Sequence, residues 1–97
     1  MDSKTFIQAV QERRTYYAID KNITVSEAKI QEVVELAIKH APSSFNSQTS
    51  RAVILFKEQS DKFWQKTSDI LKGIVPAENF APTEAKMKGF GAGAGTI

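Results

Sequence analysis

The sequence contains no cysteine, only one histidine and no long hydrophobic run. Without cysteine the chain can form no disulfide bond, thiolate zinc site or cysteine nucleophile, and a single histidine argues against a transition-metal site. No stretch approaches the roughly 18 apolar residues of a membrane span, and the mixed N-terminus has no apolar signal-peptide core. These absences predict a cytoplasmic protein with no membrane partner and no bound metal.

The chain also lacks a strong excess of charge of either sign. Thirteen Lys and Arg face 11 Asp and Glu, which leaves a net charge of +2, and the basic residues are scattered along the sequence. A nucleic-acid interface needs a clustered basic stripe or patch, so we expect no nucleic-acid partner; a small basic nucleic-acid binder has only the pI in its favour. The length of 97 residues and the hydrophobic content of 41% are typical of one globular domain, residues 1–97.

Two helices are predicted in the first half of the chain. The first covers about Ser3 to Glu12, with Ser3 or Asp2 as its N-cap. The second begins after an N-cap at Ser26 and ends before Pro42, because proline disfavours helical geometry in the residue before it. Its apolar residues recur with helical spacing and form one stripe: Ile30, Val33, Val34, Ala37 and Ile38.

The second half begins with a predicted strand, Ala52 to Phe56, which is apolar on both faces. Such a strand is typically central in its sheet and covered by helices on both sides. A third helix is predicted from about Ser60 to Leu71, with Gly73 as its stop, and a short last helix from Thr83 to Phe90.

The end of the sequence, residues 89–97, is rich in glycine and resembles a turn that leads into a strand. A glycine-rich tail loses much backbone entropy when it becomes ordered. We therefore expect that this end either is disordered or is cut off from a longer parent protein, and we favour the longer parent.

The first polar cluster follows the first predicted helix. Its two guanidinium groups and neighbouring hydroxyls supply many hydrogen-bond donors in a short stretch, and arginine matches phosphate geometry. The alternative is that both arginines are solvated or pair with the nearby acids Glu12 and Asp20. The cluster, called the arginine cluster below, consists of Arg13, Arg14, Thr15 and Tyr17.

The second polar cluster lies in the stretch PSSFNSQTSR, between the second helix and the predicted strand. Its hydroxyl and amide groups can both donate and accept hydrogen bonds, which suits a flat neutral heterocycle. The alternative is an ordinary helix-to-strand loop, in which Pro, Ser and Asn are common. The cluster, called the serine loop below, consists of Pro42, Ser43, Ser44, Asn46 and Gln48.

Other chemically capable residues have simpler interpretations. His40 lies near a helix C-terminus, where its charge favours capping over catalysis, and Trp64 beside Phe63 has the spacing of a core residue. No pair of carboxylates is spaced for acid–base chemistry. We therefore assign no catalytic side chain.

Taken in order, ERRTYYAID after a short helix and APSSFNSQTSRAVILF after an amphipathic helix resemble the N-terminal half of the nitroreductase family. The second motif is the more specific. The resemblance runs from about Ser3 to Ile97 and covers about the first half of a typical family member. It implies an α+β nitroreductase-like fold, truncated in this sequence, with helices packed around a mainly antiparallel sheet.

The resemblance also implies roles for both clusters. In the family, the basic pair and hydroxyl after the first helix hold the FMN phosphate and ribityl chain, roles that fall on Arg13, Arg14 and Thr15. Many relatives carry Lys or Arg where this chain has Tyr17, whose phenol brings one hydrogen bond and no charge. The serine loop, Pro42, Ser43, Ser44, Asn46 and Gln48, contacts the flavin of the partner subunit in the family.

The function implied is that of an FMN-dependent oxidoreductase that passes electrons from NAD(P)H to nitroaromatic, quinone or similar acceptors. Such enzymes are homodimers with the flavin at the subunit interface, and the flavin carries the redox chemistry. The family's second half supplies further strands and flavin contacts. The alternative is therefore a catalytically inactive dimerisation or flavin-binding remnant of the same family.

Overall fold

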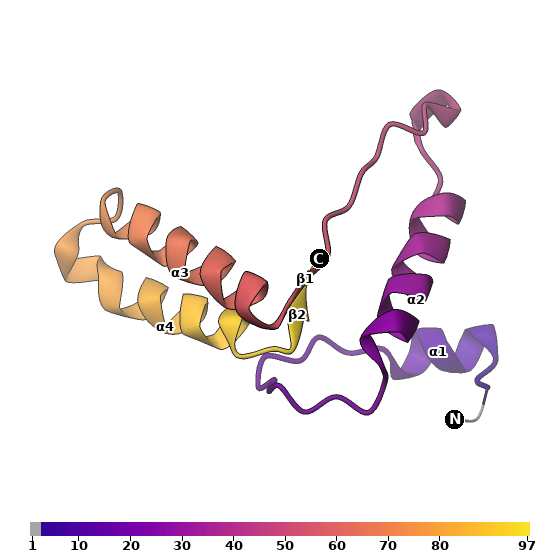
Figure 1. Ribbon diagram of the computed structural model, residues 1–97, viewed down its shortest axis with the longest axis horizontal. Coiled ribbons are helices and arrows are strands. Elements are labelled where there is room, and N and C mark those ends of the chain that lie inside the picture. Colours follow the sequence, from indigo (N-terminus) through magenta and orange to yellow (C-terminus); the bar gives the residue numbers. More distant parts are fainter. Residues whose placement is uncertain (1–2) are drawn as a thin grey trace.

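The computed structural model describes residues 3–97, and within them it has four α-helices and one pair of short strands (Figure 1). The strands are antiparallel, so the α+β class with antiparallel pairing is confirmed. The α-helices and strands, in chain order, are α1 (Phe6–Glu12), α2 (Glu27–His40), β1 (Leu55–Phe56), α3 (Lys57–Lys72), α4 (Phe80–Gly91) and β2 (Gly95–Thr96). Two 3₁₀ turns are η1 (Ser44–Asn46) and η2 (Ala77–Asn79).

Helix α1 begins later than the sequence predicts. Its N-cap is Thr5, whose hydroxyl accepts a hydrogen bond from the Gln8 N–H at 3.2 Å, while the Gln8 side chain accepts one from the Thr5 N–H at 3.0 Å. This reciprocal capping box satisfies two donors at the helix start. Ser3 as the cap is therefore wrong, and the other candidate, Asp2, lies outside the described residues.

Helix α2 has both predicted ends. The Ser26 hydroxyl accepts a hydrogen bond from the Lys29 N–H at 3.1 Å, which confirms the N-cap. The helix ends at His40, and Ala41 is extended, with φ −68° and ψ 133°, immediately before Pro42. The N-cap hydroxyl and the proline each act within a few residues of the chain, so the local sequence is enough to determine both ends of α2.

The predicted central strand is much shorter than the apolar run, and that prediction is wrong. Of residues 52–56, only Leu55 and Phe56 form a strand, and Val53 is 68% exposed. One neighbour, β2, pairs with β1, and within residues 3–97 no second strand lies on its other edge. The apolar run thus lacks the sheet partners and helical cover that its composition suits.

Helices α3 and α4 lie side by side and form a hairpin at one end of the long axis (Figure 1). Trp64 on α3 joins them, since its ring centroid lies 5.2 Å from that of Phe90 on α4. The predicted stop at Gly73 is confirmed by its position as the C-cap of α3. The last helix begins earlier than predicted, at Phe80. Pro82 is compatible with this start because it falls in the first turn of the helix, where its missing N–H removes no intrahelical hydrogen bond.

The glycine-rich end forms the second strand of the sheet. Leu55 pairs with Thr96 and Phe56 with Gly95. Gly95 is required to be small, because a Cβ there would lie 2.8 Å from the Leu55 carbonyl oxygen. The glycine-rich end is thus the sheet partner of β1, a pairing that the sequence did not predict.

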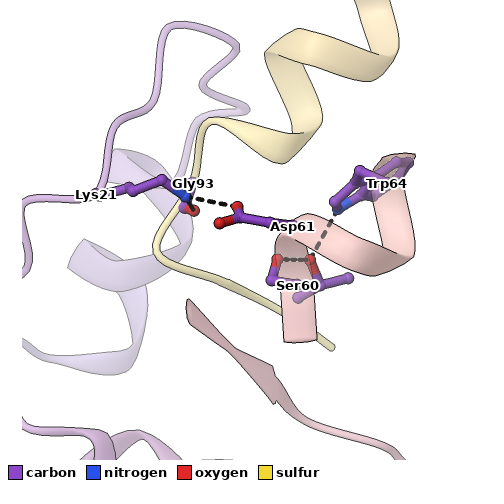
Figure 2. Close-up of polar contacts among 6 residues, drawn as sticks. Lys21, Ser60, Asp61, Trp64 and Gly93 are labelled. Atoms are coloured by element: carbon purple, nitrogen blue, oxygen red, sulfur yellow. Dashed lines mark hydrogen bonds and ion pairs between the residues drawn. The ribbon is translucent and has the colours of Figure 1, made fainter. Parts of the chain in front are cut away.

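A polar latch holds β2 against α3 (Figure 2). The Thr96 hydroxyl lies 2.7 Å from the hydroxyl of Ser60, and it accepts a hydrogen bond of 2.8 Å from the indole N–H of Trp64. Ser60 is 1% exposed, so its hydroxyl needs this partner. We call Ser60, Trp64 and Thr96 the threonine latch.

The chain as a whole is open. Its radius of gyration is 16.7 Å, whereas a compact domain of this length has about 12.5 Å. Its accessible surface is 8414 Å², against about 5,500 Å² for a folded monomer of this mass. Within residues 3–97 no hydrophobic side chain is fully buried. Much apolar surface that would form a core in a compact domain is therefore uncovered in this chain.

Candidate functional site

The arginine cluster lies on the exposed segment directly after α1. Arg13 is the C-cap of that helix, and its N–H donates to the Ala9 carbonyl at 3.1 Å. The chain then leaves the helix, since Arg13 has ψ 132°, and all four residues of the cluster are exposed. The end of α1 thus presents two guanidinium groups, a hydroxyl and a phenol to solvent.

The nearby acids have other partners. Glu12 forms an ion pair with Lys4, and the Asp20 carboxylate accepts a hydrogen bond from the Asn22 N–H at 2.8 Å. Within residues 3–97, neither Arg13 nor Arg14 forms an ion pair. The two guanidinium groups carry ten N–H donors, five on each, and within residues 3–97 only one of these donors is used in a side-chain hydrogen bond, from Arg14 to the Arg13 carbonyl. Most of the donors are therefore available to a ligand. The donor chemistry of the cluster therefore fits a phosphate group.

The serine loop is shaped by bonds around Ser43. The Ser43 carbonyl accepts from the Asn46 N–H at 3.0 Å, and its hydroxyl accepts from the Gln48 N–H, also at 3.0 Å. These two bonds hold the 3₁₀ turn η1 at the end of α2. The hydroxyl of Ser44 and the side-chain amides of Asn46 and Gln48 have no hydrogen-bond partner in the part of the chain described, so they are free for a ligand.

The same loop has an unusual backbone. Phe45, Asn46 and Gln48 all have φ of 53°, in the left-handed region that residues with a side chain rarely adopt. Each such residue costs of order 1 kcal/mol or more, and strained residues cluster at ligand-binding sites. Phe45 is also fully exposed. The backbone strain and the exposed ring both favour a binding role over that of a plain connection.

The structure does not bring the two clusters together in one chain. They lie at opposite ends of α2, whose 14 residues span about 21 Å, and no hydrogen bond joins them in residues 3–97 (Figure 1). A hollow of about 300 Å³ lies at the serine loop and is lined by Ser43 and Gln48, but by no residue of the arginine cluster. A ligand that used both clusters of one chain would have to span the length of α2.

Sequence reasoning missed two basic residues at this hollow. Lys39, in the last turn of α2, and Arg51, after the serine loop, line it together with Ser43 and Gln48. The Arg51 guanidinium donates to the carbonyl oxygens of Gln48 and Ser50 at 3.3 and 2.9 Å, which fixes its position. The sequence feature that could have identified them is their position, since Lys39 precedes the serine loop and Arg51 follows it.

Two kinds of feature are absent from residues 3–97. No group of three or more His, Cys, Asp or Glu side chains is arranged to hold a metal ion. No helix in this range combines the length and the apolar character needed to cross a bilayer.

Comparison with known proteins gives related sequences and structures. Residues 10–96 match the family described as "Nitroreductase family". The chain is 36% identical over 91 residues to "Putative nitroreductase HBN1" of Saccharomyces cerevisiae, an overlap of 90% of this chain and 45% of that protein.

Two structures of the nitroreductase CinD from Lactococcus lactis are similar to this chain. The complex with chloramphenicol has a TM-score of 0.75 and 36% identity, and the match covers 94% of this chain and 44% of that one. The complex with nicotinic acid has a TM-score of 0.72 and 32% identity, with coverage of 94% and 45%. The chain thus spans about half the length of the relatives it matches. A match over residues 10–96 and this likeness in structure show that the chain belongs to the nitroreductase family.

Proposed function

We propose that this chain is the FMN-binding N-terminal part of an oxidoreductase that transfers electrons from NAD(P)H to nitroaromatic, quinone or similar acceptors. Membership of the nitroreductase family supports an oxidoreductase activity. The related CinD structures hold chloramphenicol and nicotinic acid, so the relative accepts small aromatic ligands. We expect the same class of ligand here.

The observation that carries the proposal is the separation of two free donor sets along α2. The arginine cluster offers cationic forks that have no acidic partner within residues 3–97, and the serine loop offers neutral hydroxyl and amide groups on a strained backbone. Phosphate and isoalloxazine are the two chemically different ends of FMN. A homodimer in which the arginine cluster of one subunit and the serine loop of the other meet the same flavin accounts for both sets.

In this arrangement the chain's own residues bind and orient. Arg13 and Arg14 hold the phosphate, Thr15 and Tyr17 donate to the ribityl chain or ring edge, and the serine loop contacts the ring. The bound flavin supplies the hydride-transfer chemistry. Tyr17 would donate one hydrogen bond near the ring and would bring no positive charge there.

The experiment is a visible spectrum of the purified chain, followed by titration with FMN and an assay of NAD(P)H-dependent reduction of a quinone. A flavin spectrum with turnover supports the full proposal. A colourless protein that does not bind added FMN contradicts it.

Arg13→Ala tests the phosphate role directly. Loss of a charge-assisted contact of about 1.5–3 kcal/mol weakens FMN binding roughly 10- to 100-fold. Riboflavin, which lacks the phosphate, is expected to bind the variant and the wild type alike. Lys72→Ala, at the far end of α3, is the matched control and leaves both affinities unchanged. Equal losses for FMN and riboflavin would argue against a phosphate site.

A second candidate function is a flavin-binding or dimerisation remnant without catalysis. The observation in its favour is the open structure, with 8414 Å² of exposed surface. Binding of FMN to a stable dimer, without reduction of any acceptor, distinguishes this candidate from the enzyme.

A further inference from the structure

Lys21 ties the segment that carries the arginine cluster to the α3–α4 hairpin. Its ammonium group lies between two oxygens (Figure 2), the Asp61 carboxylate on α3 at 2.8 Å and the Gly93 carbonyl between α4 and β2 at 3.4 Å. Of the hydrogen bonds and ion pairs that residues 3–22 form in the described part of the chain, only these two reach a residue beyond that stretch. Lys21 is therefore the polar anchor of the segment.

An apolar contact and a short turn lie beside this anchor. The Ile19 side chain rests on Gly93, since a Cβ at position 93 would lie 2.9 Å from Ile19 Cδ1. The Ile19 N–H donates to the Tyr17 carbonyl at 3.1 Å. The Asp20 carboxylate accepts a hydrogen bond from the Asn22 N–H at 2.8 Å. The last residue of the arginine cluster is thus joined to the anchor by a hydrogen-bonded turn.

The two oxygens that receive Lys21 belong to the better packed part of the molecule. Asp61 directly follows Ser60 in α3, and Gly93 comes three residues before Thr96 in the chain. Ser60 and Thr96 are joined in the threonine latch at 2.7 Å. Because the latch holds α3 and β2 together, both acceptors of Lys21 have a fixed position.

The charges around Lys21 include a second possible partner. The hollow beside the anchor, of about 270 Å³, is also lined by Glu27, Lys57 and Glu58. Glu27 and Lys57 pair with each other at 3.4 Å, whereas Glu58 forms no ion pair within residues 3–97. Glu58 is therefore available to Lys21 if Asp61 is removed, and a variant that breaks the anchor from the hairpin side has to remove both carboxylates.

We propose that Lys21 is a positioning residue for the flavin phosphate, because it holds the arginine cluster in place against Asp61 and Gly93. The inference rests on the proposed function, in which Arg13 and Arg14 bind the phosphate. A cluster that moves freely has to be ordered when FMN binds, and this ordering lowers the affinity. The anchor is an exposed ion pair, so its loss is expected to weaken FMN binding only about two- to fivefold.

Two variants break the anchor with opposite changes of charge. Lys21→Met removes a cation, whereas the double variant Glu58→Gln, Asp61→Ala removes two anions. Fluorescence titration of the 97-residue chain is expected to show FMN affinity about two- to fivefold lower in both variants and riboflavin affinity unchanged. A long-range effect of charge would act with opposite sign in the two variants, and direct contact of Lys21 with phosphate would spare the double variant. Either result, or equal losses for both flavins, would overturn the proposal.

Lys29→Met is the matched control. It removes the same charge as Lys21→Met and breaks a comparably exposed pair, with Glu32, inside α2. Both flavin affinities are expected to stay at the wild-type value. A loss of FMN affinity equal to that of Lys21→Met would show that the position of the lysine does not matter, which contradicts an anchor.

A distance measurement tests the anchor without any ligand. The chain has no cysteine, so nitroxide labels at Gln11→Cys on α1 and Lys72→Cys on α3 are specific. Double electron–electron resonance is expected to give a broader distribution of label distances with Lys21→Met than in its absence, and no broadening with Lys29→Met. Equal widths for Lys21→Met and the wild type would overturn the proposal whether or not FMN binds.

The wild-type titration separates this inference from the proposed function. A wild-type chain that binds no FMN contradicts the proposed function, and a broader distance distribution for Lys21→Met would then show an anchor with no role in flavin binding. Wild-type binding of FMN with no loss in the anchor variants contradicts the positioning role alone.

Discussion

The α3–α4 hairpin with its strand pair, residues 55–97, and the N-terminal arm, residues 3–54, are held by different forces. In the hairpin, aromatic rings pack between two helices and the threonine latch fastens the last strand. In the arm, neither α1 nor α2 packs extensively against another helix or strand. The side chains of Phe6 and Val10 are exposed to solvent.

The junction between the two regions contains ion pairs beside the Ile19 side chain, which lies against Gly93. Lys21 of the arm pairs with Asp61 at 2.8 Å and donates to the Gly93 carbonyl at 3.4 Å (Figure 2), and Lys57 pairs with Glu27 at 3.4 Å. Exposed ion pairs contribute little, whereas packed rings contribute much. The comparison teaches that the hairpin is the better packed unit and that much of the apolar surface of the arm is uncovered within residues 3–97.

The largest expected effect is that of Trp64→Ala on the hairpin. The substitution removes the ring that contacts Phe63 and Phe90 and also the donor to Thr96, and we expect a loss of about 3 kcal/mol. Hydrogen exchange of the α3 and α4 amides measures it. Phe6→Ala in the arm, where the ring is 80% exposed, is the control and changes exchange by less than about 0.5 kcal/mol. Similar effects at both positions would contradict the comparison.

Thr96→Val tests the latch alone. The valine keeps the shape but leaves the Trp64 N–H and the buried Ser60 hydroxyl without a partner, at a cost of about 1–3 kcal/mol. Faster exchange is expected first at β1 and β2. Thr96→Ser retains the hydroxyl and is expected to retain most of the protection; if serine and valine behave alike, the hydrogen bonds are not what holds the strand.

The smallest effect is expected for Lys21→Met at the junction. The pair with Asp61 is more than half exposed on both sides, so its loss costs about 0.5 kcal/mol or less. The measurable change is in shape, because the arm moves away from the hairpin and the radius of gyration in small-angle X-ray scattering rises. Lys29→Met breaks a comparably exposed pair inside α2 and leaves the radius unchanged. A radius that does not respond to Lys21→Met would show that other contacts hold the arm.

The arginine cluster and the serine loop were found from residue types alone, since their chemistry is local to two short stretches. Whether they bind FMN stays a prediction. Lys39 and Arg51 were missed because they lie 12 residues apart and meet only when the chain turns back at η1. The apolar run 52–56 also predicts a covered central strand, and the prediction is wrong because cover has to come from other segments, which one short stretch does not specify.

The sequence by itself determined both ends of α2, the end of α3 and the family. Ser26, Pro42 and Gly73 act through hydrogen bonds and dihedral limits that span a few residues, so neighbours in sequence suffice. Only the tertiary structure decided that Ser60 is buried, that the glycine-rich end pairs with β1, and that Thr96 meets a hydroxyl 36 residues away. Such contacts depend on how the chain closes its long loops, and no local pattern encodes that closure.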